Sequence, residues 1–185
     1  MVDVIETQRL ILRDWREEDF PLFARINADP LIMEYMPRVL PPEDSDKLVR
    51  RFQAHLKKHG YGMFAVERKE DGAFMGTVGL NNVEFKAPFT PAVEIAWRLD
   101  YEFWGQGYAT EAARAVLGEA FNGWGLKEIV SFTVHDNSRS THVMEKLGMV
   151  KDEKGDFDYP GLVKGHPLGR FVLYRLKKSQ LTAQD

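Results

Sequence analysis

The chain has 185 residues, of which 44% are hydrophobic, and this length suits one core, so we expect residues 1–185 to form a single domain. The formal net charge is −3 without a long run of one sign, which argues against a nucleic-acid partner because nucleic-acid binding needs a basic face. The absence of cysteine excludes a disulfide framework, a thiolate zinc site and a cysteine nucleophile.

The first half of the chain predicts two helices and an antiparallel group of strands. A short aliphatic-rich stretch comes first, and two stretches with apolar residues at helical spacing follow it. Gly60 ends the second helix, and the turn Glu70–Gly72 joins two strands as antiparallel neighbours. The expected elements are a strand at 9–15, helices at 17–28 and 41–59, and strands at 61–68, 73–82 and 92–100.

The second half alternates strands and helices. Residues 110–121 and 137–147 predict helices, and a strand at 129–134 lies between them. Two further strand candidates follow, at 157–159 and 171–176. The pattern predicts an α+β fold with a central mixed, mostly antiparallel sheet of six or seven strands, flanked by about four helices.

One segment carries a pattern that is typical of a phosphate-binding site. The strand Val93–Leu99 is followed by Trp104–Ala112, in which Gly105 and Gly107 precede an amphipathic helix. Glycines let backbone N–H groups approach a ligand, and a helix N-terminus adds unpaired N–H groups and partial positive charge. No lysine follows as in a Walker A loop, and Thr110 stands where a dinucleotide fingerprint needs its last glycine. A tight turn without a ligand is the alternative interpretation.

A second polar segment, Asp136–Thr141, directly follows the expected strand at 129–134. Asn137 or Ser138 in this segment can cap the next helix. Capping alone would explain these residues, so the segment by itself does not identify a site.

Taken together, the two segments resemble the GNAT superfamily of acetyltransferases, and most closely its RimJ/RimL-like branch, which acetylates the N-termini of ribosomal proteins. The likeness covers most of the chain, and two ordered motifs at the expected separation are more specific than either alone. The stretches that carry it are Thr7–Arg13, Met75–Leu80, Trp104–Ala112 and Asn137–Met149.

The resemblance implies a sheet that is splayed at a binding site for acetyl-coenzyme A. The backbone N–H groups of residues 106–110 would hold the coenzyme pyrophosphate, and the strand before them would pair with the pantetheine arm. The implied cofactor-binding residues are Trp97, Arg98, Leu99, Gln106, Gly107, Tyr108, Ala109, Thr110 and Asn137.

Two residues are candidates for catalysis. Only a neutral amine attacks a thioester, and an alkyl ammonium has a pKa of about 10.4, so a carboxylate that takes its proton would help near pH 7. Glu94 lies on the strand expected to line the acetyl site and is the first candidate base, with Glu84 and Glu67 as alternatives. Met144 stands where many superfamily members have a tyrosine that protonates the leaving thiolate. Ser140 is the nearest candidate for that role, or it hydrogen-bonds the sulfur while solvent supplies the proton.

The remaining patterns concern metals and membranes. The five histidines are scattered and form no His-Glu-x-x-His pair, so we expect no metal. The N-terminus is acidic where a signal peptide needs a basic region, and no stretch approaches the roughly 18 apolar residues of a membrane span. We therefore expect a cytoplasmic protein without a membrane partner.

The sequence thus predicts an acetyl-coenzyme A-dependent N-acetyltransferase that acts on a primary amine by direct attack in a ternary complex. The acceptor is either a protein N-terminus or a small amine, and the net charge of −3 slightly favours a cationic one. The alternative is a non-catalytic sensor that binds acetyl-coenzyme A and a partner protein, since Met144 replaces the usual tyrosine. We expect a monomer or a homodimer, and the segment 156–170 carries no motif.

Overall fold

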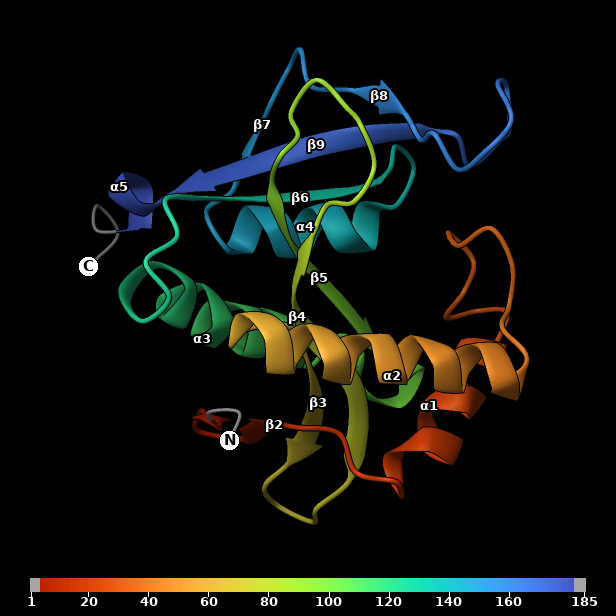
Figure 1. The fold of residues 1–185 in the computed structure, drawn as a ribbon, viewed down its shortest axis with the longest axis vertical. Helices are drawn as coiled ribbons and strands as arrows, with labels where there is room; N and C mark the ends of the chain where they lie inside the picture. Colours follow the sequence, from red (N-terminus) through yellow and green to blue (C-terminus); the bar gives the residue numbers. More distant parts are fainter. Residues whose placement is uncertain (1–3, 182–185) are drawn as a thin grey trace.

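A computed structural model describes residues 4–181, and its centre is one nine-stranded sheet with helices on both faces (Figure 1). The strands are β1 (Ile5–Glu6), β2 (Leu10–Arg13), β3 (Met63–Arg68), β4 (Phe74–Asn82), β5 (Val93–Leu99), β6 (Glu128–Val134), β7 (Val150–Lys151), β8 (Phe157–Asp158) and β9 (Arg170–Lys177). The helices are α1 (Asp19–Ala28), α2 (Pro42–His59), α3 (Tyr108–Asn122), α4 (Ser138–Lys146) and α5 (Lys178–Leu181), with a 3₁₀ turn η1 (Tyr101–Phe103).

The α+β architecture predicted from the sequence is confirmed, with more elements than the sequence indicates. The sheet has nine strands rather than six or seven because β1 and β7 contain two residues each, which is too short to show an alternating pattern. The fifth helix, α5, is a single turn of four residues, which is likewise too short to show a helical period. The other elements differ from the expected ones only at their ends.

The sheet is mixed and mostly antiparallel, as predicted. Its strand order is β1-β2-β3-β4-β5-β6-β9-β7, and β8 pairs with β9 outside this path. The pair β5–β6 is parallel, and all the other described pairs are antiparallel. The parallel pair needs a crossover connection, and α3 supplies it.

The sheet opens at the junction between β5 and β6. Across these two strands Glu94 lies opposite Val130, and the Ser131 hydroxyl donates to the Ile95 carbonyl over 3.0 Å. Beyond this point the strands diverge. In Figure 1, β6 and β9 run roughly horizontally, whereas β3, β4 and β5 run steeply from top to bottom. The divergence leaves one edge of β5 without a strand partner.

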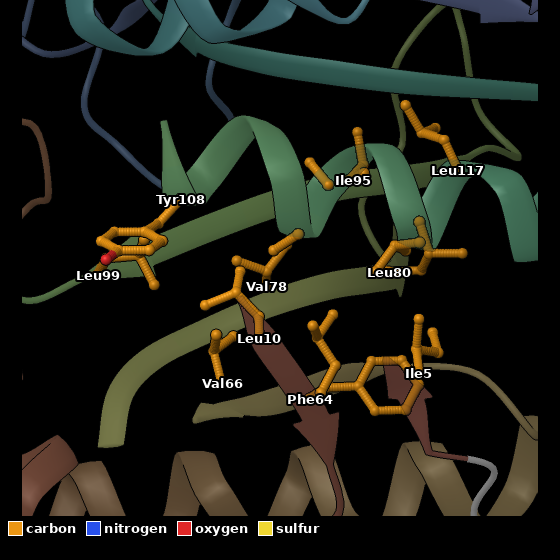
Figure 2. Packing of buried hydrophobic residues seen from close by; sticks show 14 of the residues in the cluster. Ile5, Leu10, Phe64, Val66, Val78, Leu80, Ile95, Leu99, Tyr108 and Leu117 are labelled. Carbon is orange, nitrogen blue, oxygen red and sulfur yellow. The ribbon is translucent and has the colours of Figure 1, made fainter. Parts of the chain in front are cut away.

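The main core lies between α3 and the sheet. Leu10, Val78 and Ile95 from three strands meet Leu117 from α3, and each of these side chains is at most 1% exposed (Figure 2). Burying one side chain of this size contributes about 1.5–3 kcal/mol. This packing fixes the direction of α3, whose N-terminus points to the opening between β5 and β6.

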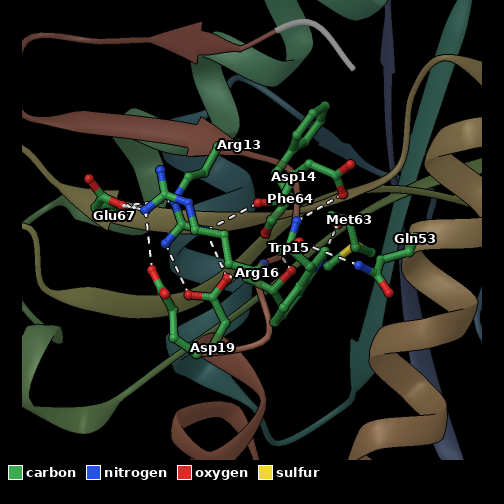
Figure 3. Close-up of polar contacts among 11 residues, drawn as sticks. Arg13, Asp14, Trp15, Arg16, Asp19, Gln53, Met63, Phe64 and Glu67 are labelled. Carbon is green, nitrogen blue, oxygen red and sulfur yellow. Dashed lines mark hydrogen bonds and ion pairs between the residues drawn. The ribbon is translucent and has the colours of Figure 1, made fainter. Parts of the chain in front are cut away.

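A buried ion network joins the N-terminal elements (Figure 3). Arg13 on β2 donates to both carboxylate oxygens of Asp19 on α1, over 2.7 and 2.9 Å, and its Nε donates to Glu67 on β3 over 2.7 Å. The Trp15 indole donates to the Met63 carbonyl beside it. Glu67, an alternative base in the sequence analysis, is therefore engaged in a structural ion pair.

Candidate active site

A cleft of about 880 Å³ opens where β5 and β6 diverge. This volume lies in the range of sites that hold small molecules and cofactors. One wall is α2 with the α1–α2 connection, and the other is formed by the start of α4 and residues near β8 and β9. All the site residues predicted from the sequence line this cleft except Gln106.

The glycine loop before α3 has the geometry of an anion site. Gly107 is the N-cap of α3 and has a φ of +82°, a conformation that glycine adopts without a steric cost. The first intrahelical bond runs from the Glu111 N–H to the Gly107 carbonyl. The N–H groups of Tyr108, Ala109 and Thr110 therefore have no partner within the helix, and they lie at its positive end.

An arginine from the other end of the chain holds this loop in place. Arg9 donates through both terminal nitrogens to the Gln106 carbonyl, over 3.1 and 3.2 Å, and through Nε to Glu111 over 2.7 Å. The same carboxylate accepts from the Thr7 hydroxyl over 2.6 Å. In the sequence, the stretch Thr7–Arg13 contributes only to a resemblance, whereas in the structure Thr7 and Arg9 hold the glycine loop in position.

The second motif is built around one asparagine. The Asn137 side-chain oxygen accepts from the Ser140 backbone N–H over 3.2 Å, which caps α4 as expected. Its amide nitrogen donates to the hydroxyls of Thr133 and Ser140, over 2.9 and 3.1 Å. Because the Ser140 oxygen accepts this bond, its own proton is available to another group in the cleft. Met144 lies one turn further along α4, lines the cleft and is 1% exposed.

Glu94 lies on the floor of the cleft at the point where the strands diverge. It is half-buried, and no described hydrogen bond or ion pair involves it. Desolvation by the surrounding protein raises the pKa of its carboxyl to about 8. Asn81 on β4 is its cross-strand neighbour. The carboxyl therefore titrates where a general base of an amine reaction is useful.

The backbone of β5 beyond Glu94 borders the opening. Trp97, Arg98 and Leu99 pair with β4 along one edge, and the edge toward β6 has no recorded register partner after Glu94. The Leu99 carbonyl accepts from the Trp104 indole over 2.9 Å, which ties the strand end to the glycine loop. The free edge offers peptide groups to an extended ligand.

A wall of aromatic rings borders the cleft near Glu94, and no pattern in the sequence indicates it. Its members come from three separate segments, so no local periodicity marks them. Tyr159 stacks on Phe171 with 5.0 Å between ring centroids and meets Phe85 edge-on at 5.3 Å. Burial, and then the negative charge of Glu94, raise the pKa of the Tyr159 hydroxyl. The segment 156–170, which carries no motif, thus supplies part of the site.

The α1–α2 connection crosses over to α4. Glu34 in this connection forms an ion pair with Arg139, and the Tyr35 hydroxyl donates to the Asp136 carbonyl over 3.3 Å. The Arg139 guanidinium also lies 4.6 Å from the Trp104 ring centroid. Glu84, the other alternative base, lines the cleft but is exposed and pairs with Arg51. The pair leaves Glu94 as the free carboxylate of the lining.

Residues 4–181 contain no group of three or more histidines, aspartates or glutamates placed to hold a metal ion. No helix within this range is both long and apolar enough to cross a lipid bilayer.

Known proteins of similar sequence and fold include acetyltransferases. The acetyltransferase (GNAT) domain matches residues 9–150. The uncharacterized protein YkkB of Bacillus subtilis is 31% identical over 144 residues, which is 77% of this chain and 83% of that protein. A GNAT-family acetyltransferase from Bacillus anthracis has the same fold, with a TM-score of 0.78 and 24% identity, covering 96% of this chain and 99% of that one.

A further similar structure contains bound coenzyme A. RimL, an α-N-acetyltransferase of ribosomal protein L7/L12 in complex with coenzyme A, matches with a TM-score of 0.74 and 19% identity, over 95% of this chain and 98% of that one. The family match spans both motifs and the whole opening between β5 and β6. The chain belongs to the GNAT family of acetyltransferases.

Proposed function

We propose that this protein transfers the acetyl group of acetyl-coenzyme A to a primary amine by direct attack in a ternary complex. The observation that carries the proposal is the opening between β5 and β6, which has the glycine loop before α3 at one end and the unpaired carboxylate of Glu94 at the other. The phosphates and the thioester of the coenzyme lie at opposite ends of a long arm, so this separation suits it. The complex of RimL with coenzyme A, on the same fold, supports this use of the opening.

The chain offers a separate partner for each part of the coenzyme. The unpaired N–H groups of Tyr108, Ala109 and Thr110 would bind the pyrophosphate. The free edge of β5 at residues 97–99 would pair with the amides of the pantetheine arm, in the manner of an added strand. The side-chain amide nitrogen of Asn137 donates to the hydroxyls of Thr133 and Ser140, so Asn137 contributes to coenzyme binding by holding those side chains in position.

The residues around the thioester then divide the chemistry. Glu94 takes a proton from the acceptor ammonium, and the neutral nitrogen attacks the carbonyl carbon of the thioester. Backbone N–H groups on the free edge of β5 stabilise the oxyanion. The carbon–sulfur bond breaks, and the leaving thiolate receives its proton from Ser140 or from solvent. The nitrogen, which is positively charged after the attack, releases its second proton to solvent, and solvent reprotonates Ser140 if its proton was used. Nitrogen ends as an amide, and no covalent intermediate with the enzyme forms.

Calorimetric titration with acetyl-coenzyme A, followed by thiol release with a panel of amines, tests the proposal. We expect a dissociation constant in the micromolar range or tighter, and thiol release that depends on the amine. Binding without thiol release for any amine would favour the sensor alternative, which Met144 in place of a tyrosine still motivates. The proposal fails if the protein does not bind the coenzyme.

A further inference from the structure

One arginine in the cleft has no acidic partner. Arg98 is half-buried, its Nη1 donates to the Asn27 side-chain oxygen over 2.6 Å, and its Nη2 lies 3.6 Å from the Met36 sulfur. Both partners are neutral, and burial lowers the pKa of this guanidinium to about 10, so it remains charged at neutral pH. The other arginines of the lining each pair with a carboxylate, in the pairs Arg38–Asp44, Arg51–Glu84 and Arg139–Glu34.

The position of this guanidinium is fixed by buried groups. Asn27 at the end of α1 is fully buried, and its amide nitrogen donates to the Ser45 hydroxyl over 2.8 Å. Ser45 on α2 is fully buried as well. This chain of contacts orients Arg98 without neutralising it, which leaves its remaining N–H donors for an anion.

The side chain of Arg98 points toward α1 rather than toward the glycine loop that is proposed to bind the coenzyme phosphates. Alternate residues of a strand share a face, so Glu94 and Arg98 lie on one face of β5. Ile95 and Leu99 lie on the other face, where they pack beside α3 (Figure 2). The guanidinium contacts α1, whereas the glycine loop leads into α3. The backbone of Arg98 can therefore serve the coenzyme while its side chain serves the acceptor.

We propose that Arg98 binds a carboxylate of the acceptor, and that the acceptor is a free amino acid whose reacting amine lies several bonds from that carboxylate. The inference rests on the proposed function, which places the amine at Glu94. Residues four apart in a strand are separated by about 13 Å. The Glu94 carboxylate lies close enough to Tyr159 to raise the pKa of its hydroxyl, whereas the Arg98 guanidinium contacts Asn27. An α-amino group and the carboxylate of the same amino acid are too close together to contact Glu94 and Arg98 at the same time.

The charges of the cleft argue against a polyamine. A polyamine carries several ammonium groups and needs an acid for each. The acids of the lining are Glu84, which already pairs with Arg51, and Glu94. A second ammonium group beyond Glu94 would approach Arg98, and like charges repel. The net charge of −3 favoured a cationic acceptor at the level of the whole sequence, but the local distribution in the cleft favours an anionic group.

The decisive experiment compares amines that differ only in the carboxylate. Thiol release is measured with 6-aminohexanoate, with 6-aminohexanamide and with glycine, for the wild type and for Arg98→Gln. In the wild type, kcat/KM for 6-aminohexanoate should exceed that for the amide by about ten- to a hundredfold, the effect of one charge-assisted contact. Arg98→Gln should abolish this preference by raising KM for the carboxylate by a larger factor than KM for the amide. Arg98→Lys should restore part of it.

A matched control and a binding measurement separate the outcomes. Arg38→Gln removes an exposed arginine of the same cleft that already pairs with Asp44, and it should leave the preference unchanged. Calorimetric titration with hexanoate and hexanamide in the presence of coenzyme A reports the carboxylate site without turnover. The inference is overturned if the wild type treats acid and amide alike, or if Arg98→Gln lowers both equally, as a purely structural role would. A higher kcat/KM for glycine than for 6-aminohexanoate would overturn the inference that the amine and the carboxylate of the acceptor lie several bonds apart. In all three cases amine-dependent thiol release would leave the proposed function standing.

Discussion

Glu94 derives its chemistry from desolvation rather than from a neighbouring charge. A carboxyl with a pKa of about 8 is largely protonated at pH 7, and it becomes a base as the pH rises. The desolvation needs the strands and helices around the cleft to be assembled. No local pattern around Glu94 in the sequence could therefore distinguish it from Glu84, which is exposed and paired.

Glu94→Gln should change the pH dependence of the reaction. In the wild type, kcat/KM should rise with pH and level off near pH 8, where the carboxyl is deprotonated. The variant must take neutral amine from solution, so its kcat/KM should continue to rise toward the alkyl ammonium pKa of about 10.4. The loss should be about 10²- to 10⁴-fold below pH 8 and should shrink above it. Thiol release across this range measures both profiles.

The control for this prediction is Glu84→Gln, because Glu84 lines the same cleft but pairs with Arg51. Its pH profile should match that of the wild type. A ratio between wild type and Glu94→Gln that stays constant across the range would remove Glu94 from the role of base.

Ser140→Ala should lower kcat more than it lowers the affinity for acetyl-coenzyme A. The variant loses the hydroxyl that Asn137 orients, but the cap on α4 remains because it uses the Ser140 backbone N–H. We expect kcat to fall by about tenfold or more if the hydroxyl protonates the thiolate. Ser138→Ala, an exposed neighbour on the same helix, is the control. An unchanged kcat would mean that solvent supplies the proton.

At the scale of elements, the glycine loop and α3 act as one unit because Arg9 ties them to β2. The sequence located this loop from two glycines and a helix start. It could not show that Arg9 and Glu111 meet, because these residues are 102 positions apart and only the packing of β2 against α3 brings them together. The same limit applies to the aromatic wall around Tyr159, whose members lie on separate segments.

Gly107→Ala should weaken binding of acetyl-coenzyme A by about ten- to a hundredfold, as calorimetry measures it. A residue with a side chain at a φ of +82° is strained, and relief of the strain would turn the loop amides away from the pyrophosphate. Gly72→Ala is a matched control, because Gly72 also has a positive φ of +70° and open space around it, in the turn between β3 and β4. Both variants should lose similar stability. Equal coenzyme affinity in the two would exclude the loop from the site.

At the scale of the whole molecule, the Arg13 network joins β2, α1 and β3 in the half of the protein that carries the α1–α2 wall (Figure 3). Arg13→Met should lower the free energy of unfolding by about 3–5 kcal/mol, because Asp19 would be left buried without an ion-pair partner, whereas Glu67 would keep only the exposed Arg16. Arg170→Met removes an exposed pair with Asp158 and should cost less than about 1 kcal/mol. Urea unfolding of both variants gives the comparison. Similar midpoints would show that the Arg13 network contributes little.

The sequence by itself determined the fold class and the two motifs, because hydrophobic periodicity, glycine positions and helix caps are local and depend on neighbours within a few residues. The family followed from the resemblance of these motifs, in their order, to those of known acetyltransferases. It also named Glu94 and Arg98 among the residues of the site. Only the tertiary structure decided what their side chains do, since that depends on burial and charge supplied by distant segments. Desolvation sets the pKa of Glu94. Contact with Asn27 on α1 fixes Arg98, which has no acidic partner, four residues further along the same strand. Two-residue strands and the aromatic wall likewise exist only through pairing and packing in space.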